Sequence, residues 1–332
     1  MSVRDVIVEA RGLKKYFPNK KGLLQKTVSH VRAVDGVDLS IHRGGVVGIV
    51  GESGCGKSTI ARLLTTLIPP TEGTVIFDGV DANSSDKAVK YAVRRRMNIV
   101  FQDPFSSLNP RMTAAEIVSE PIHAHGLAKS NRERIGRVAA LMEQCGLFAD
   151  QIYRYPHQFS GGQRQRLCIA RALASSPEFI VCDEAVSALD VSIQAQIINL
   201  LMDLRERHGL TYVFISHDLN VVRFISDEVV VMYLGQIVEQ AAKEDLFQNP
   251  LHPYTAALLS AVPDIGAAGA NAEKKGIILQ EDIPSPSAHP HGCRFHTRCQ
   301  CAAPACGEHG NEPELREIAP GRHVRCHLAY CP

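Results

Sequence analysis

The fold of this chain is decided by the segment Gly51-Glu52-Ser53-Gly54-Cys55-Gly56-Lys57-Ser58. It matches the pattern G-x-x-x-x-G-K-[ST], in which backbone N–H groups surround phosphates, the lysine reaches the β- and γ-phosphate oxygens, and the last hydroxyl contacts Mg²⁺. Residues 45–50 form an apolar run typical of a buried strand, and residues 58–67 have a helical pattern. A phosphate loop needs this order of strand, loop and helix. The sequence therefore predicts that residues 51–58, followed by Thr59, bind a nucleotide.

The bulk composition bounds the class of protein. The chain has 332 residues and a formal net charge of +1, with 45% hydrophobic and 21% charged residues. This balance is ordinary for a globular protein, and the near-zero charge argues against nucleic acid as a partner. The first residues lack the apolar stretch of a signal peptide, and no apolar run reaches the roughly 18 residues that cross a bilayer. We expect a cytoplasmic protein whose membrane role comes through partners.

Strand-like and helical stretches alternate along the chain. We expect strands near residues 3–17, 34–41, 73–77 and 98–101, with a Lys- and Gly-rich loop or hairpin connection at 18–31. Residues 113–150 have the patterns of several helices and suggest a helical subdomain. Beyond it, apolar runs at 179–182, 211–215 and 229–232 are separated by helices, which predicts a parallel α/β sheet.

Two carboxylates follow one of these apolar runs, in Phe179-Ile180-Val181-Cys182-Asp183-Glu184. A buried strand ending at Asp183 places its carboxylate beside the phosphate loop, where it can hold Mg²⁺ together with Ser58. Glu184 is then placed to orient or deprotonate the attacking water. Taken alone, the run would be interpreted as a strand that ends in solvated acids. The phosphate loop in the same chain favours the catalytic interpretation.

A second anion site is predicted at Ser160-Gly161-Gly162-Gln163, which opens an amphipathic helical pattern over residues 164–173. Exposed N–H groups and the helix dipole at such an N-terminus both favour phosphate. A glycine-containing turn with an N-cap is the alternative if the segment is considered alone.

Together these motifs resemble the nucleotide-binding subunit of an ATP-binding cassette (ABC) transporter. The phosphate loop, Phe159-Ser160-Gly161-Gly162-Gln163, Asp183-Glu184, Ser187-Ala188-Leu189-Asp190 and Ser216-His217-Asp218 occur in the family's order and spacing, and the likeness covers roughly residues 5–260. It implies an α/β ABC-type nucleotide-binding domain with a parallel sheet core, an antiparallel β edge and a helical subdomain. We expect that ATPase domain at 1–262, with the helical subdomain at about 103–172.

The resemblance also implies roles for single residues. Tyr16 matches the aromatic residue that stacks on adenine, and Gln102 the glutamine that touches Mg²⁺ and the attacking water. The segment Ser160-Gly161-Gly162-Gln163 matches the signature that contacts ATP bound to the opposite subunit, and Asp190 lies in a loop that crosses the interface. His217 matches the histidine that bonds the γ-phosphate and helps hold Glu184, although a lone histidine after a strand is more often structural.

One departure from the family pattern follows the catalytic carboxylate. The family commonly has Pro-Thr where this chain has Ala185-Val186. Losing the proline removes a φ constraint. Both acids remain, so we expect active hydrolysis.

Further segments resemble the ATPase subunits of bacterial dipeptide/oligopeptide importers: residues 101–112, 155–159 and 249–255, and Cys293-Arg294-Phe295 and Arg298-Cys299 near the end. Gly54-Cys55-Gly56 and residues 188–192 favour the second, F-type subunit. This likeness implies uptake of dipeptides or oligopeptides with a sister ATPase, two transmembrane permeases and an extracytoplasmic binding protein, at the cytoplasmic face of the membrane. An importer of nickel, glutathione or antimicrobial peptides is the alternative. A non-transport ABC ATPase and a regulatory ATP-binding module are less favoured.

The last residues are rich in cysteine. Six of the ten cysteines lie after residue 292, and we expect a linker at 263–280 before a cysteine-rich module at 281–332. In a reducing cytoplasm such clustering indicates metal binding more readily than disulfides. The importers it resembles carry a [4Fe–4S] cluster on four such cysteines, here Cys293, Cys299, Cys306 and Cys326. The same thiols suit a structural Zn²⁺, and an unmetallated module is the third possibility.

Overall fold

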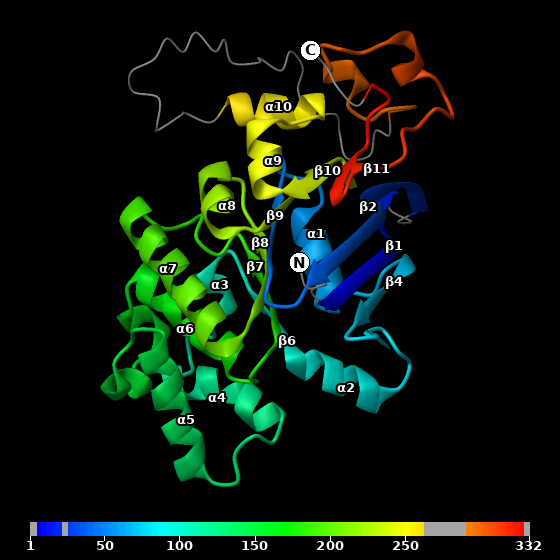
Figure 1. Ribbon diagram of the computed structural model, residues 1–332. Helices are drawn as coiled ribbons and strands as arrows, with labels where there is room; N and C mark the ends of the chain where they lie inside the picture. Colours follow the sequence, from blue (N-terminus) through cyan, green and yellow to red (C-terminus); the bar gives the residue numbers. More distant parts are fainter. Residues whose placement is uncertain (1–4, 22–25, 262–289, 329–332) are drawn as a thin grey trace, which may run out of the picture.

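Two β-sheets organise the computed structural model, which describes residues 5–21, 26–261 and 290–328 (Figure 1). The first is a four-stranded sheet in the order β2-β1-β4-β5, and the second has eight strands in the order β11-β12-β10-β9-β3-β8-β7-β6. The strands are β1 (Val6–Lys21), β2 (Lys26–His42), β3 (Val46–Val50), β4 (Glu72–Phe77), β5 (Val80–Asp81), β6 (Met97–Val100), β7 (Phe179–Asp183), β8 (Thr211–Ile215), β9 (Glu228–Tyr233), β10 (Gln236–Ala242), β11 (Arg316–Ala319) and β12 (Arg322–Val324).

Helices cover the eight-stranded sheet. They are α1 (Lys57–Leu64), α2 (Lys87–Arg96), α3 (Pro104–Ser107), α4 (Ala114–Ala124), α5 (Asn131–Gln144), α6 (Gly161–Leu173), α7 (Val191–His208), α8 (Leu219–Ile225), α9 (Lys243–Gln248) and α10 (Pro253–Ser260), with short 3-10 turns η1 (Ala149–Tyr153), η2 (Pro156–Gln158), η3 (His296–Arg298) and η4 (Pro304–Gly307). Helices α4, α5 and α6 gather in the lower part of Figure 1 and pack against one another. Within the described ranges, no helix combines the length and apolarity needed to cross a bilayer.

The centre of the large sheet is parallel, as the apolar runs predict. β6, β7, β8, β3 and β9 pair in parallel, and all residues of β3, β7 and β8 are buried. Strands covered on both faces have no solvent side, which explains their continuous apolar sequences. Parallel strands place their carboxyl ends on one edge, so the loops after β3, β6, β7 and β8 meet there.

The antiparallel sheet is larger than the sequence suggests. β1 pairs with β2 from Val6 to Lys21, so described residues within 18–31 continue these strands where a loop or hairpin connection is expected. Tertiary pairing outweighs the weak strand propensity of the lysines there. The hairpin tip, residues 22–25, lies outside the described residues.

The C-terminal segment, residues 290–328, packs onto the ATPase core. β12 pairs with β10 and extends the main sheet, and Phe295 joins the same buried cluster as the helical subdomain. Its orange and red trace lies beside β10 and α10 in Figure 1. The segment is polar and short, so it gains its apolar contacts from the larger domain. The predicted linker at 263–280 falls outside the described residues.

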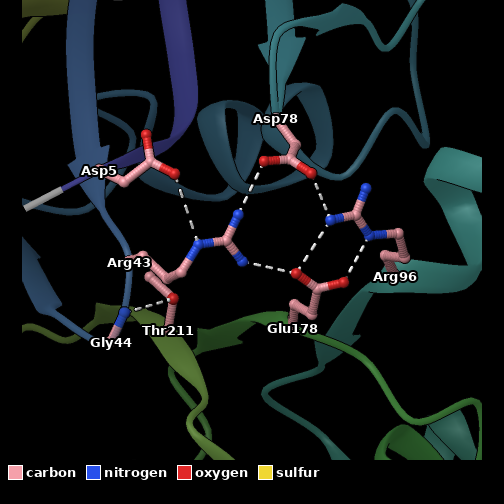
Figure 2. Close-up of polar contacts among 7 residues, drawn as sticks. All are labelled: Asp5, Arg43, Gly44, Asp78, Arg96, Glu178 and Thr211. Carbon is pink, nitrogen blue, oxygen red and sulfur yellow. Dashed lines mark hydrogen bonds and ion pairs between the residues drawn. The ribbon is translucent and has the colours of Figure 1, made fainter.

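An ion-pair network joins the two sheets at the amino ends of the parallel strands (Figure 2). Arg43, just after β2, contacts Asp78 at 2.7 Å and Glu178 at 2.6 Å. Arg96, at the end of α2, contacts the same two carboxylates, each at 2.5 Å. The network therefore fastens the antiparallel sheet to the starts of β6 and β7, opposite the edge that carries the catalytic motifs.

Candidate functional site

A cavity of about 260 Å³ opens at the carboxyl edge of the parallel strands. The loops after β3, β6 and β7 bring the phosphate loop, Gln102 and Glu184 to its wall. Its lining residues are Val31, Arg32, Ala33, Ser53, Gly54, Gly56, Lys57, Ser58, Thr59, Gln102, Glu184, Leu234, Pro290 and Arg294. The cavity therefore brings the phosphate loop, predicted to bind ATP, together with two of the three predicted catalytic residues, Gln102 and Glu184.

The phosphate loop is closed by its own glycines and lysine. Gly56, which precedes α1, has φ +110°, and a Cβ there would lie 2.1 Å from the carbonyl oxygen of Ala33. No other residue type could take this conformation so close to the neighbouring backbone. The Lys57 ammonium donates to the carbonyl oxygens of Gly51 at 2.7 Å and Glu52 at 2.9 Å. It is thereby placed at the mouth of the loop, where phosphate oxygens can replace these carbonyls.

A hydroxyl and a carboxylate form the predicted Mg²⁺ position. The Ser58 hydroxyl donates to the Asp183 carboxylate at 3.1 Å, which joins two motifs 125 residues apart. Burial raises the pKa of Asp183, and the Ser58 hydrogen bond partly opposes that rise. A hard cation between these two oxygens would favour the ionised carboxylate and suits this donor set.

Glu184 lies between Gln102 and His217, of which the resemblance assigns only His217 to hold it. The Gln102 amide donates to the Glu184 carboxylate at 2.7 Å, and His217 Nδ1 lies 3.5 Å from the same oxygen. Gln102 follows β6 and His217 follows β8, on the two sides of β7. The three side chains therefore converge because three neighbouring parallel strands end together.

Packing holds the Glu184 loop without the family's proline. Glu184 has φ +49°, its backbone N–H donates to Ile215 at 3.0 Å, and the Ser187 hydroxyl donates to its carbonyl at 3.0 Å. Ala185 and Val186 are 2% and 1% exposed. Burial of these two side chains fixes the loop where a φ constraint is lost.

The signature segment, residues 159–163, opens α6. Ser160 and Gln163 form a capping box in which the serine hydroxyl accepts from the Gln163 N–H and the glutamine side chain accepts from the Ser160 N–H. In the part of the chain that the structure describes, neither this segment nor Asp190 lines the nucleotide cavity. Asp190 precedes α7 and is exposed. The two predicted phosphate sites of one chain are thus separate.

Among the described residues, Tyr16 does not line the cavity, but Asp35 links it to Arg32 and Arg294, which do. Its hydroxyl donates to the Asp35 carboxylate, which also pairs with Arg294, and Arg32 lies 5.7 Å from the ring. Arg32 and Arg294 line the cavity but are missing from the sequence predictions. The segment Cys293-Arg294-Phe295 is the sequence signal for Arg294, although its pattern indicates the importer branch rather than a nucleotide-site residue.

The four predicted metal-binding cysteines surround one small cavity in the C-terminal segment. Cys293, Cys299, Cys306 and Cys326 are free thiols, and His252, Phe295 and Cys301 share the lining. Burial raises the pKa of the Cys293 thiol to about 11. Across the described ranges, no three His, Cys, Asp or Glu side chains converge on a point that could hold a single metal ion.

Two family models match the chain. The model described as ABC transporter matches residues 34–187, and the model described as oligopeptide/dipeptide transporter, C-terminal region, matches residues 238–306. The first covers the phosphate loop, the signature and the catalytic carboxylate. The second begins in β10 and reaches into the C-terminal segment.

Characterised relatives match over nearly the whole chain. The oligopeptide transport ATP-binding protein AppF of Bacillus subtilis is 52% identical over 98% of each chain, and the dipeptide transport ATP-binding protein DppF of Haemophilus influenzae is 48% identical over 96% of each. Among solved structures, the dimeric ATP-binding cassette MJ0796 bound to ADP and Pi has a TM-score of 0.64 and 33% identity, covering 71% of this chain and 99% of its own. The chain therefore belongs to the ATP-binding subunits of ABC transporters, in the group that carries the oligopeptide/dipeptide transporter C-terminal region.

Proposed function

We propose that this chain is the ATP-hydrolysing subunit of a membrane importer for dipeptides or oligopeptides. The observation that carries the proposal is the single cavity where the phosphate loop, Gln102 and Glu184 meet, with His217 beside the Glu184 carboxylate. Two relatives named as oligopeptide and dipeptide transport ATP-binding proteins support the class of solute.

Each side chain of the site has its own role in hydrolysis. Lys57 and the backbone N–H groups of residues 51–59 bind the phosphates of ATP, with Tyr16 on the adenine. Ser58, Asp183 and Gln102 hold Mg²⁺, which neutralises charge on the phosphates. Glu184 orients the attacking water and accepts its proton, while His217 bonds the γ-phosphate and holds the Glu184 carboxylate. Such catalysis consists of positioning and charge stabilisation rather than covalent chemistry.

The complete site needs a second ATPase subunit. Ser160, Gly161, Gly162 and Gln163 lie apart from this chain's own cavity, which supports their role on ATP held by the opposite subunit, with Asp190 at the interface. The structural relative MJ0796 is described as a dimer bound to ADP and Pi. We assign a sister ATPase as that partner, two transmembrane permeases as the coupled subunits, and an extracytoplasmic peptide-binding protein as the source of solute. The chain then works as a peripheral subunit at the cytoplasmic face of the membrane.

We also propose that the chain has two domains joined by a linker. We assign residues 1–262 to the ATPase domain, with the helical subdomain at about 103–172, residues 263–280 to a linker and residues 281–332 to the cysteine-rich module. The mutual packing of α4, α5 and α6 supports the subdomain.

We further assign a [4Fe–4S] cluster to Cys293, Cys299, Cys306 and Cys326, with Zn²⁺ as the alternative. Four thiolates are the ligand set of such a cluster and also of a tetrahedral Zn²⁺ site. The shared lining of one small cavity by all four thiols supports a common site on them. When bound, the cluster would cross-link a segment that has little core of its own.

Transport itself tests the proposed function. We expect a cell lacking this chain to lose uptake of labelled dipeptides or oligopeptides and to regain it with the wild-type chain but not with Lys57→Ala. Copurification with membrane permeases is expected in the same strain. Copurification with ribosomes, or normal peptide uptake without the chain, would contradict the proposal.

Metal analysis tests the cluster separately. Oxygen-free preparations are expected to hold about four iron and four acid-labile sulfide per chain, lost together in Cys299→Ser. Cys145→Ser, which changes a buried free thiol in the helical subdomain, is the matched control and should keep both. Stoichiometric zinc without acid-labile sulfide would show that the four thiols hold Zn²⁺ and not a [4Fe–4S] cluster.

A further inference from the structure

Two arginines of the C-terminal segment contact the nucleotide site directly. Arg298, at the end of η3, donates two hydrogen bonds to the Glu52 carboxylate, at 2.7 and 2.9 Å. Glu52 is the second residue of the phosphate loop and stands 246 residues from Arg298 in sequence. The Arg298 side chain is 4% exposed and that of Glu52 is 20% exposed. A buried, two-bond pair of this kind fixes geometry as well as charge.

The backbone of Glu52 is held from the same side. Its N–H donates to the Tyr254 hydroxyl of α10 at 2.9 Å. The Tyr254 ring packs 5.4 Å from the ring of Phe295, which belongs to the C-terminal segment and is 2% exposed. Phe295 also lines the cysteine cavity. Tyr254 and Phe295 therefore link the backbone of Glu52, near the start of the phosphate loop, to the cavity that the cysteines line.

Arg294 makes an equivalent contact on the side of Tyr16. It pairs with Asp35 and donates to the carbonyl of Leu234, and its side chain is 5% exposed. Asp35 also accepts the hydroxyl of Tyr16. Arg294 thus holds the carboxylate that orients Tyr16.

We infer that Arg298 and Arg294 are positioning residues for nucleotide binding, so that the C-terminal segment is part of the ATP site and not only an appendage. Arg298 holds the phosphate loop through Glu52, and Arg294 holds the Tyr16 side through Asp35. A loop fixed before the ligand arrives loses less conformational freedom on binding, which raises affinity. This inference rests on the proposed role of residues 51–59 and Tyr16 in ATP binding.

Removing one partner of a buried pair leaves the other charge without compensation, while removing both does not. The full chain is therefore compared as wild type, Arg298→Gln, Glu52→Gln and the double variant, by calorimetric titration with MgATP. Each single change is expected to weaken MgATP binding about five- to tenfold, and the double variant no more than either single one. For Arg298→Gln, turnover of the assembled transporter at saturating ATP is expected to stay within about twofold of the wild type. Wild-type affinity in Arg298→Gln, or losses that simply multiply in the double variant, would overturn the assignment of Arg298.

Inorganic triphosphate separates the two arginines. Arg298→Gln should weaken binding of triphosphate as much as it weakens MgATP, because the contact supports the phosphate loop. Arg294→Gln should weaken MgATP by a similar factor but leave triphosphate binding within about twofold, because the contact supports Tyr16. Equal losses for both ligands in Arg294→Gln would overturn its assignment.

Controls distinguish an effect on the ATP site from undocking of the whole C-terminal segment. Arg322 docks the segment by donating to the Asn249 carbonyl and lies 3.7 Å from the Glu239 carboxylate of β10, and none of these partners lines the nucleotide cavity in the part of the chain that the structure describes. Arg322→Gln is expected to keep MgATP affinity within about twofold while Arg298→Gln does not. An equal loss in both would assign the effect to docking and overturn specific positioning. Lys57→Ala must lose both ligands; if it binds them normally, the proposed function fails rather than this inference.

Discussion

The Gln102 side-chain amide donates a 2.7 Å hydrogen bond to the Glu184 carboxylate. This bond spans 82 residues of sequence and joins the loop after β6 to the end of β7. Because both loops leave one edge of a parallel sheet, a shift of the Gln102 loop moves the Glu184 carboxylate, to which we assign the activation of water. Gln102 is exposed, so a permease that contacts this surface can be coupled to hydrolysis by this bond.

The Mg²⁺ position is tested by Asp183→Asn. The carboxylate meets the Ser58 hydroxyl at 3.1 Å, and the amide that replaces it has no charge to offer a cation. We expect MgATP turnover to fall by about 100-fold or more, and ATP binding in the presence of EDTA to match the wild type. Asp203→Asn, an exposed change on α7, is the control and should have no effect on either measurement. Full Mg²⁺-dependent turnover in Asp183→Asn would rule out this position.

The signature is tested by Ser160→Arg. Ser160 is exposed and lies apart from this chain's own cavity, so ATP should bind its phosphate loop with wild-type affinity. Turnover of the assembled transporter should fall by about tenfold or more, because the arginine blocks the phosphate site offered to the opposite subunit. Ser130→Arg alters an equivalent helix-capping serine on α5 and should preserve turnover. Weak ATP binding by the isolated Ser160→Arg chain would place the signature in its own site instead.

The network in Figure 2 predicts a pH-dependent contribution to stability. Hydrogen bonding from Arg96 lowers the pKa of Glu178 below its ordinary value of 4.5. Such a group stabilises the folded state above that ordinary value and loses its contribution as pH falls through the lowered one. Because the network is about one-third exposed, Glu178→Gln should reduce the free energy of unfolding at pH 7 by only about 1 kcal/mol.

Urea unfolding at several pH values measures this contribution. The difference between wild type and Glu178→Gln should stay constant from pH 7 down to about 4.5 and shrink below it. Glu206→Gln on the exposed side of α7 should cause a change within about 0.5 kcal/mol at every pH. A difference that grows as the pH falls would have the wrong sign for this network.

Much of the fold can be predicted from local sequence patterns. The phosphate loop, the apolar run before Asp183 and the helix after Ser160 each depend on near neighbours in sequence, and each element lies within a few residues of its expected place. Buried strands separated by helices predict that the sheet is parallel, whereas the placement of Gln102 and His217 with the nucleotide was implied by the resemblance to ABC transporter subunits.

Long-range pairing could not be predicted in the same way. Asn19 pairs with Ser29 only because β1 and β2 align, and no local signal in residues 18–31 shows this. Likewise Arg298 is one basic residue among many until folding places it against Glu52. Contacts of this kind depend on how the C-terminal segment docks, and charge alone does not choose the partner.

The central claim is hydrolysis of ATP at Glu184, and MgATP turnover by Glu184→Gln in the assembled transporter tests it most directly. The glutamine keeps the size of the side chain but cannot accept the proton of the attacking water. We predict that turnover falls by about 100-fold or more while MgATP affinity stays within about threefold of the wild type. Turnover at the wild-type rate in Glu184→Gln would contradict the account.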